Sequence, residues 1–120
     1  MFFVDEGKEI LRIQKTLTSE DPKDPKTKIA YKLFSLNRSA GTAVVIDLKS
    51  KQFDTFLRLE DSKGTLIAED DDGGGGTNSR ISIVITRDDT YRLIVTSDDG
   101  KMGDFTLTVR EMKRRPGISE

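Results

Sequence analysis

Apolar side chains recur at every second position along most of this chain, and this alternation constrains the fold more than any other feature. Ile81, Ile83 and Ile85 show it in one run. Successive side chains of a β-strand point to opposite faces, so such a run indicates a strand with one buried face. The 3.6-residue period of a helix is hard to find, and we place no helix. The alternating runs cover residues 10–17, 29–34, 44–49, 55–60, 65–68, 81–86, 91–96 and 105–110.

Turn-forming residues bound each of these eight short runs. One example is DSKG at 61–64, with glycine where a hairpin favours a positive φ. Regularly spaced short strands predict an all-β protein, a single antiparallel β-sandwich or barrel of about eight strands. The length of 120 residues suits one domain. We place that domain at residues 10–112, between an N-terminal extension (1–9) and a flexible C-terminal tail (113–120).

Charge and composition exclude several functions. The 20 basic residues nearly balance the 21 acidic ones, which argues against a nucleic-acid binder or a polybasic membrane surface. The chain has no cysteine and no histidine, so thiol catalysis, zinc–thiolate sites and the commonest general base are all excluded. Glu60 and Asp61 form a carboxylate pair, but nothing in the sequence places it in a cleft. We therefore expect that the protein is not an enzyme.

The start of the chain does not read as an export signal. MFFVDE has too short an apolar run, and no basic residues precede that run. No apolar stretch is long enough to span a bilayer, so we expect no membrane insertion. If the native protein is exported, we expect its signal to lie outside this chain.

Four acidic residues followed by four glycines, EDDDGGGG at 69–76, form the one segment that composition does not explain. Packed carboxylates repel each other unless a cation lies among them. Calcium takes roughly six to eight oxygen ligands, and carboxylates are its natural protein donors. The candidate calcium ligands are Asp70, Asp71 and Asp72, with Asp54 and Asp61 near turns in the same half of the predicted sandwich. The alternative is a solvated connection whose charge protects a sheet edge from aggregation.

Two familiar loop motifs do not fit this segment. Counted from Asp70, an EF-hand would need an oxygen donor at position five and glutamate at position twelve, where the chain has Gly74 and Ile81. A phosphate-binding loop would need Gly-Lys-Ser/Thr opening a helix, whereas residues 77–80 lead into a predicted strand. A cation site and a solvated loop remain the two interpretations.

The two tyrosines, Tyr31 and Tyr91, are candidates for stacking on a sugar or on collagen. Each lies in an alternating run, on the face that carries Leu or Ile, so we predict that both belong to the core. The chain has no tryptophan, and an exposed aromatic platform is therefore poorly supported.

Several segments of the chain, in their order and spacing, resemble one known family. They are SAG at 39–41, VVIDLKS at 44–50, FDTFLRL at 53–59, DSKGTLIA at 61–68, DDD at 70–72, NSRI at 78–81, TYRLIV at 90–95 and GDFTLTV at 103–109. This pattern resembles the bacterial pre-peptidase C-terminal domain, a β-sandwich of jelly-roll type, over roughly residues 13–111.

The resemblance implies a non-catalytic accessory or binding module of an exported bacterial protein. Some relatives are removed during maturation; others, in collagenases, bind collagen and use calcium to order the domain. Calcium is thus the candidate ion, and the acidic early loop with Asp21 and Asp24 is a looser candidate for further ligands. The implied partner is a protein, matrix or cell-surface ligand, and the implied location is secreted, cell-surface or periplasmic. The alternative is a structural spacer or intramolecular chaperone with no ligand of its own.

Overall fold

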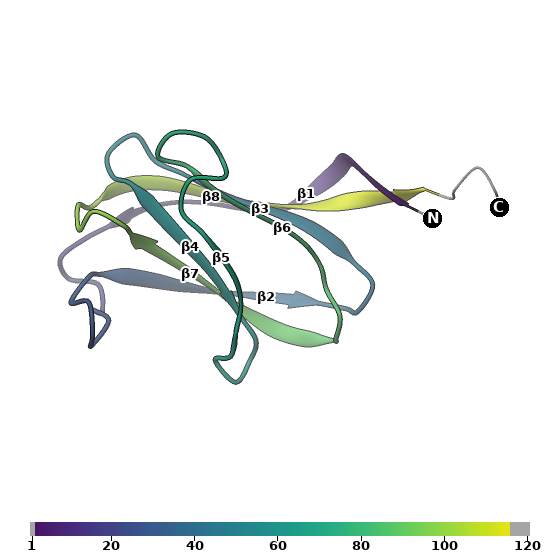
Figure 1. Ribbon diagram of the computed structural model, residues 1–120, viewed down its shortest axis with the longest axis horizontal. Helices are drawn as coiled ribbons and strands as arrows, with labels where there is room; N and C mark the ends of the chain where they lie inside the picture. Colours follow the sequence, from purple (N-terminus) through teal and green to yellow (C-terminus); the bar gives the residue numbers. More distant parts are fainter. Residues whose placement is uncertain (1, 116–120) are drawn as a thin grey trace.

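Eight antiparallel β-strands form two four-stranded sheets that pack face to face (Figure 1). The computed structural model describes the backbone of residues 2–115 and the burial of residues 7–112. The strands of the first sheet, in spatial order, are β1 (Phe2–Leu17), β8 (Gly103–Arg115), β3 (Ala43–Lys49) and β6 (Ser79–Val84). Those of the second sheet are β2 (Tyr31–Arg38), β7 (Asp89–Ser97), β4 (Thr55–Glu60) and β5 (Leu66–Asp70).

The core lies between the sheets and follows the predicted alternation. On β7, the buried residues Tyr91, Leu93 and Val95 alternate with residues that are only half-buried. Burying one such apolar side chain contributes about 1.5–3 kcal/mol, so the two inner faces hold the sheets together. The predicted all-β sandwich is confirmed. No helix occurs among residues 2–115, and so none of sufficient length and apolarity to cross a bilayer.

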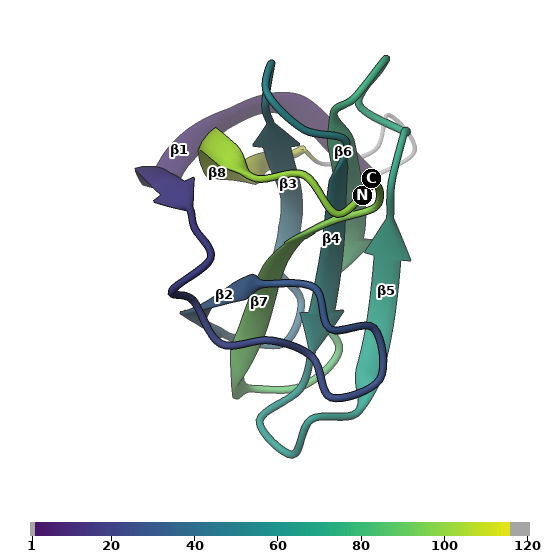
Figure 2. The same ribbon diagram turned by 90° about the vertical axis from the view of Figure 1, so that its left-hand side faces the viewer.

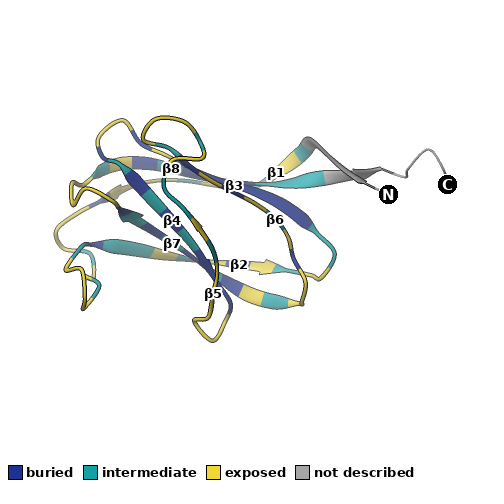
Figure 3. Ribbon diagram, in the orientation of Figure 1, coloured by how far each residue is buried: buried dark blue, intermediate teal, exposed yellow. Residues whose placement is uncertain are grey.

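One strand, β3, is buried along almost its whole length (Figure 3). Val44, Ile46 and Leu48 belong to the core cluster. Val45 and Asp47 therefore point to the outer face of the first sheet, yet they are also buried. Other side chains on the outer face must therefore cover them. Arg80 and Arg110, which contact Asp47, form part of this cover.

The terminal strands extend beyond the predicted domain boundaries. β1 begins at Phe2 rather than near Ile10, and β8 continues to Arg115, so the two strands pair beyond the sandwich (Figure 1). The pairing shifts register between Val4 and Lys8, which breaks the alternation that the sequence would otherwise display. Residues 116–120 of the predicted tail lie outside the described residues.

The strand order gathers four connections at one end of the sandwich. These are residues 18–30, 50–54, 71–78 and 98–102. Leu17 pairs with Gly103, Thr55 with Ser97 and Leu57 with Asp70, so the strand ends that carry these connections lie together. We call this the loop end; it faces the viewer in Figure 2. The connections 39–42, 61–65 and 85–88 lie at the opposite end.

Candidate metal centre

The carboxylates of Asp70, Asp71 and Asp72 lie close together at the loop end. One oxygen from each lies within 4.8 Å of the other two. Asp70 and Asp71 are half-buried, and Asp72 is exposed. Three carboxylates at this spacing repel each other, and a cation among them would relieve the repulsion.

Hydrogen bonds give the glycine run a defined turn. The Asp70 carboxylate accepts from the backbone N–H of Gly73 (2.7 Å) and of Arg80 (2.8 Å), which ties the two ends of the loop together. Gly75 and Gly76 have φ values of 92° and 60°, in the left-handed region that glycine adopts without strain. The turn itself therefore requires part of the glycine run.

Two buried hydroxyl groups attach this loop to the start of β4. Thr55 Oγ1 lies 2.6 Å from Ser79 Oγ, and both residues are fully buried. The Thr55 hydroxyl also lies 2.7 Å from the carbonyl of Thr77, and the Ser79 hydroxyl lies 3.2 Å from the carbonyl of Asp71. Buried polar groups must be hydrogen-bonded to be tolerated, so this arrangement fixes the loop against the sandwich. The sequence analysis did not identify these two residues.

Asp54 joins the acidic group from a second connection, residues 50–54. Desolvation raises the pKa of Asp54 above its ordinary value, and the negative charges of Asp98, Asp99, Asp71 and Asp72 raise it further. Carboxylates from three separate connections therefore act on one another at the loop end. The structure thus brings four of the five predicted residues into one electrostatic group.

Asp98 and Asp99 were missed because SDDG at 97–100 has the composition of an ordinary turn. Burial alone would raise the pKa of Asp99, but hydrogen bonds from the Ser97 hydroxyl and the Lys101 amide outweigh it and lower that pKa. Asp99 also accepts from the Asp54 amide at 3.3 Å. The sequence did offer one signal that could have found Asp98 and Asp99, namely the count of strands along the chain. The connections after the third, fifth and seventh strands of this sandwich all lie at the same end.

Asp61 is not part of this group, contrary to our expectation. It follows β4 whereas Asp54 precedes it, and six strand residues at about 3.3 Å each put roughly 20 Å between them. Its carboxylate instead closes the β4–β5 hairpin by accepting from the amides of Lys63 and Thr65, each at 2.9 Å. It also lies 3.6 Å from Arg87.

Asp21 and Asp24 lie in the connection 18–30, where local partners occupy their carboxylates. Asp21 pairs with Lys32 at 2.8 Å and accepts from the Thr18 amide at 2.9 Å. Asp24 accepts from the amides of Lys26 and Thr27. Both residues fix the shape of the loop, and neither is grouped with Asp70, Asp71 and Asp72.

The other candidates have structural roles. Tyr91 is buried, as predicted, and its hydroxyl donates to the carbonyl of Arg87. The prediction was wrong for Tyr31, which is half-buried because its side chain points away from the core. With Phe56 and Ile94 it lines a hollow of about 320 Å³ on the outer face of the second sheet. Glu60 pairs with Arg92 at 3.3 Å, so it is held in an ion pair.

The fold is an eight-stranded antiparallel β-sandwich with a group of carboxylates at its loop end. The family model described as "Bacterial pre-peptidase C-terminal domain" matches residues 30–97, more than half of the chain, and the chain belongs to that family. The resemblance seen in the sequence is thereby confirmed. No curated protein matches the sequence significantly.

Two solved structures share the fold. The pre-peptidase C-terminal domain of collagenase from Bacillus anthracis aligns with a TM-score of 0.62 and 14% identity, covering 82% of this chain and 87% of that one. PliG from Aeromonas hydrophila, a periplasmic inhibitor of g-type lysozyme, also aligns with a TM-score of 0.62, at 12% identity and covering 92% of each chain. At these identities the likeness is one of fold alone.

Proposed function

We propose that this domain is a non-catalytic accessory module of an exported bacterial protein, ordered at its loop end by calcium. Domains of its family are accessory domains of secreted bacterial proteins, and this supports a location outside the cytoplasm and a partner that is a protein, matrix or cell-surface ligand. One observation carries the calcium assignment: one oxygen from each of Asp70, Asp71 and Asp72 lies within 4.8 Å of the other two. The raised pKa of Asp54, caused by desolvation and by the charges of Asp98, Asp99, Asp71 and Asp72, supports the assignment.

The chemistry of this group suits a hard divalent cation. The side chains are all carboxylates, and carboxylate oxygens are the ligands that calcium prefers. Asp71 and Asp72 would hold the ion together with Asp54, while Asp70 would add its oxygen that is not bonded to the Gly73 and Arg80 amides. Bound calcium would neutralise the mutual repulsion and hold the three connections in one arrangement.

Calcium should raise the melting temperature of this protein. A ligand that binds only the folded state at about 100 times its Kd adds about 2.7 kcal/mol, which for a domain of this size is roughly 10 °C. The measurement is thermal melting across a calcium titration that starts in chelator. The double variant D71N/D72N should lose the response.

The control is Asp88→Asn, which removes one aspartate charge, where the double variant removes two, in the connection 85–88 at the opposite end. The new amide can still accept from the Ala40 backbone N–H that Asp88 now bonds at 2.7 Å. This variant should respond to calcium as the parent does. Equal melting temperatures in calcium and in chelator would remove the ion from the proposal and favour a spacer or intramolecular chaperone with no ligand.

Without metal, Asp54→Asn should stabilise the protein at neutral pH. The folded state raises the pKa of Asp54, so its ionised form costs stability at every pH above that raised value. The cost fades as the pH falls and is absent below the ordinary aspartate pKa of about 3.9. Melting curves in chelator and at low ionic strength should show the variant slightly above the parent at pH 7, because solvent screens much of the repulsion, with the gap closing on acidification. A variant that melts below the parent at pH 7 would contradict the repulsion.

A further inference from the structure

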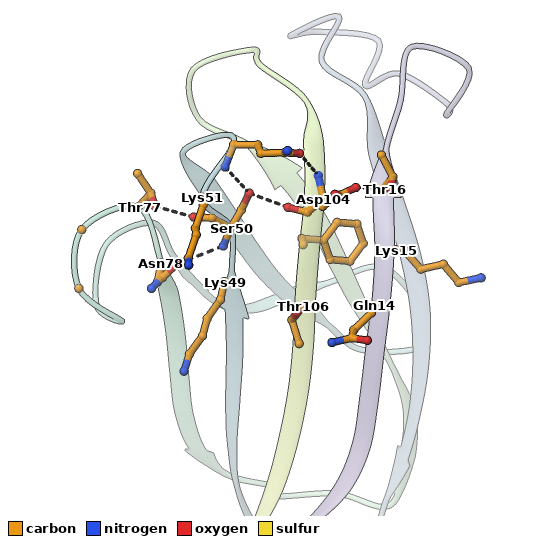
Figure 4. Close-up of a pocket in the computed structure, with 14 residues that line it drawn as sticks. Gln14, Lys15, Thr16, Lys49, Ser50, Lys51, Thr77, Asn78, Asp104 and Thr106 are labelled. Atoms are coloured by element: carbon orange, nitrogen blue, oxygen red, sulfur yellow. Dashed lines mark hydrogen bonds between the residues drawn. The ribbon is translucent and has the colours of Figure 1, made fainter.

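The outer face of the first sheet carries a regular array of polar and cationic side chains. Residues directly opposite each other on antiparallel strands share a face, so the strand register places them in rows. Two neighbouring rows cross the strands: Gln14–Thr106–Lys49 and Arg12–Thr108–Asp47–Arg80. Figure 4 shows Gln14 on β1 beside Thr106 on β8, with Lys49 on β3 next to them.

A buried carboxylate holds two arginines in place over this face. The side chain of Asp47 is 6% exposed and lies 2.6 Å from Arg80 Nε and 3.5 Å from an Arg110 guanidinium nitrogen. The arginine side chains remain 43% and 26% exposed. A guanidinium is planar, permanently charged and suited to oxyanions, and pairing with Asp47 fixes the position of both guanidinium groups at the partly exposed surface. The two arginines are therefore preorganised, and little side-chain entropy would be lost on binding.

The hollow above these residues is cationic although the whole chain has a net charge of −1. Its volume is about 380 Å³, and its charged lining consists of four cations, Arg12, Lys49, Arg80 and Arg110, against the two carboxylates of Glu9 and Asp47. The balance is a formal excess of two positive charges. Within residues 7–112, the Lys49 ammonium makes no hydrogen bond or ion pair.

A second, larger hollow continues this surface toward the loop end. It has a volume of about 960 Å³ and shares Lys49 and Thr106 with the first. Apart from two glycines and the buried Phe105, every residue that lines it is polar. Its side chains include hydroxyl, amide and ammonium groups, several of them fixed by hydrogen bonds around Ser50 (Figure 4). Such groups suit sugar hydroxyls, and the cations suit acidic substituents.

We propose that this outer face binds an acidic polysaccharide, a linear sugar chain bearing sulfate or carboxylate groups. The paired arginines and Lys49 bind the oxyanions, while Gln14, Thr106 and Thr108 bind hydroxyl groups of the chain. The cationic hollow is lined by residues of β1, β3, β6 and β8 alone, whereas the second hollow also includes residues 75–78 of the connection that calcium is proposed to order. We expect the charged contacts of the cationic hollow to form without calcium. The inference goes beyond the metal-ordered accessory role.

The test compares dextran sulfate, carboxymethyl dextran and plain dextran, which share one sugar backbone. Titrations in chelator and at low ionic strength should show binding of one or both charged dextrans and no binding of plain dextran. The first two ligands distinguish a sulfate from a carboxylate preference. The affinity should fall as salt rises, because charged contacts are screened. Using chelator makes the result independent of the calcium proposal.

The variant R12E/K49E should weaken binding of the charged dextran at least tenfold while leaving the melting temperature nearly unchanged, because both side chains are exposed. The matched control is K26E/K63E, a double charge reversal at exposed positions in the connections 18–30 and 61–65, outside both hollows. It should bind as the parent does. Equal weakening by K26E/K63E, or equal binding of plain dextran, would overturn the proposal. Equally tight binding of single-stranded DNA would overturn it as well, because sugar recognition would then have no part.

Discussion

Replacing Leu93 by alanine is expected to lower the free energy of unfolding by about 3–5 kcal/mol. Leu93 is fully buried on β7, an inner strand of the second sheet, and belongs to the core between the sheets. The truncation removes apolar surface from the core and leaves a cavity that the two sheets cannot close, since both are held by their strand pairing. Urea denaturation followed by circular dichroism measures the change.

The matched control is Leu66→Ala, the same truncation on β5 at the edge of the same sheet, where the side chain is 45% exposed. A change within about 0.5 kcal/mol is expected there, because little buried surface is lost. If the two variants were equally stable, the inner faces of the sheets would not be the core described here.

Residues such as Leu93 were predictable because their burial follows from local sequence alone. A run such as TYRLIV at 90–95 shows the period of a strand, and every second residue in it, Tyr91, Leu93 and Val95, is buried. Eight such runs were enough to predict an all-β sandwich or barrel, and the family resemblance favoured the sandwich. The pairing of β1 with β8 beyond the sandwich was not predictable in this way, because residues 2–9 and the register shift there show no regular alternation.

The acidic site was only partly predictable, because it depends on which strand ends meet. Asp70, Asp71 and Asp72 are adjacent in sequence, so their proximity was certain from the start. Asp98 and Asp99 come from a different connection and become relevant only once β7 and β4 are known to pair. Asp61 was assigned to the wrong end because only its nearness to a turn was considered. Counting strands places it at the opposite end from Asp54, since Asp54 precedes β4 and Asp61 follows it.

Asp47 shows a further limit of reading alternation. Its position on β3 correctly predicts an outward-pointing side chain, but the side chain is buried because long arginines from β6 and β8 lie over it. Arginine can cover a surface with its aliphatic stem while its guanidinium stays in water. Such cover depends on the register of three strands, which the sequence does not display.

Replacing Asp47 by alanine is expected to destabilise the protein by about 2–3 kcal/mol. The change removes two charged contacts and leaves Arg80 and Arg110 side by side without the anion between them. The cost stays below that of a fully buried pair because both arginines are partly exposed and can be hydrated. Urea denaturation of D47A, R80A and the double variant D47A/R80A gives the coupling between the two side chains, expected at about 1–2 kcal/mol.

Glu9→Ala is the control for Asp47→Ala, because it removes another carboxylate that pairs with an arginine on the same face. Glu9 and Arg12 lie 2.8 Å apart, but both are largely in water, at 41% and 54% exposed. Water and salt screen such a pair, so no measurable loss of stability is expected. Two differences would produce the contrast between the variants: Asp47 is buried whereas Glu9 is exposed, and Asp47 contacts two arginines whereas Glu9 contacts one. If Asp47→Ala were as harmless as Glu9→Ala, Asp47 would not be the anchor of the two arginines, and the cationic face would lose its preorganisation.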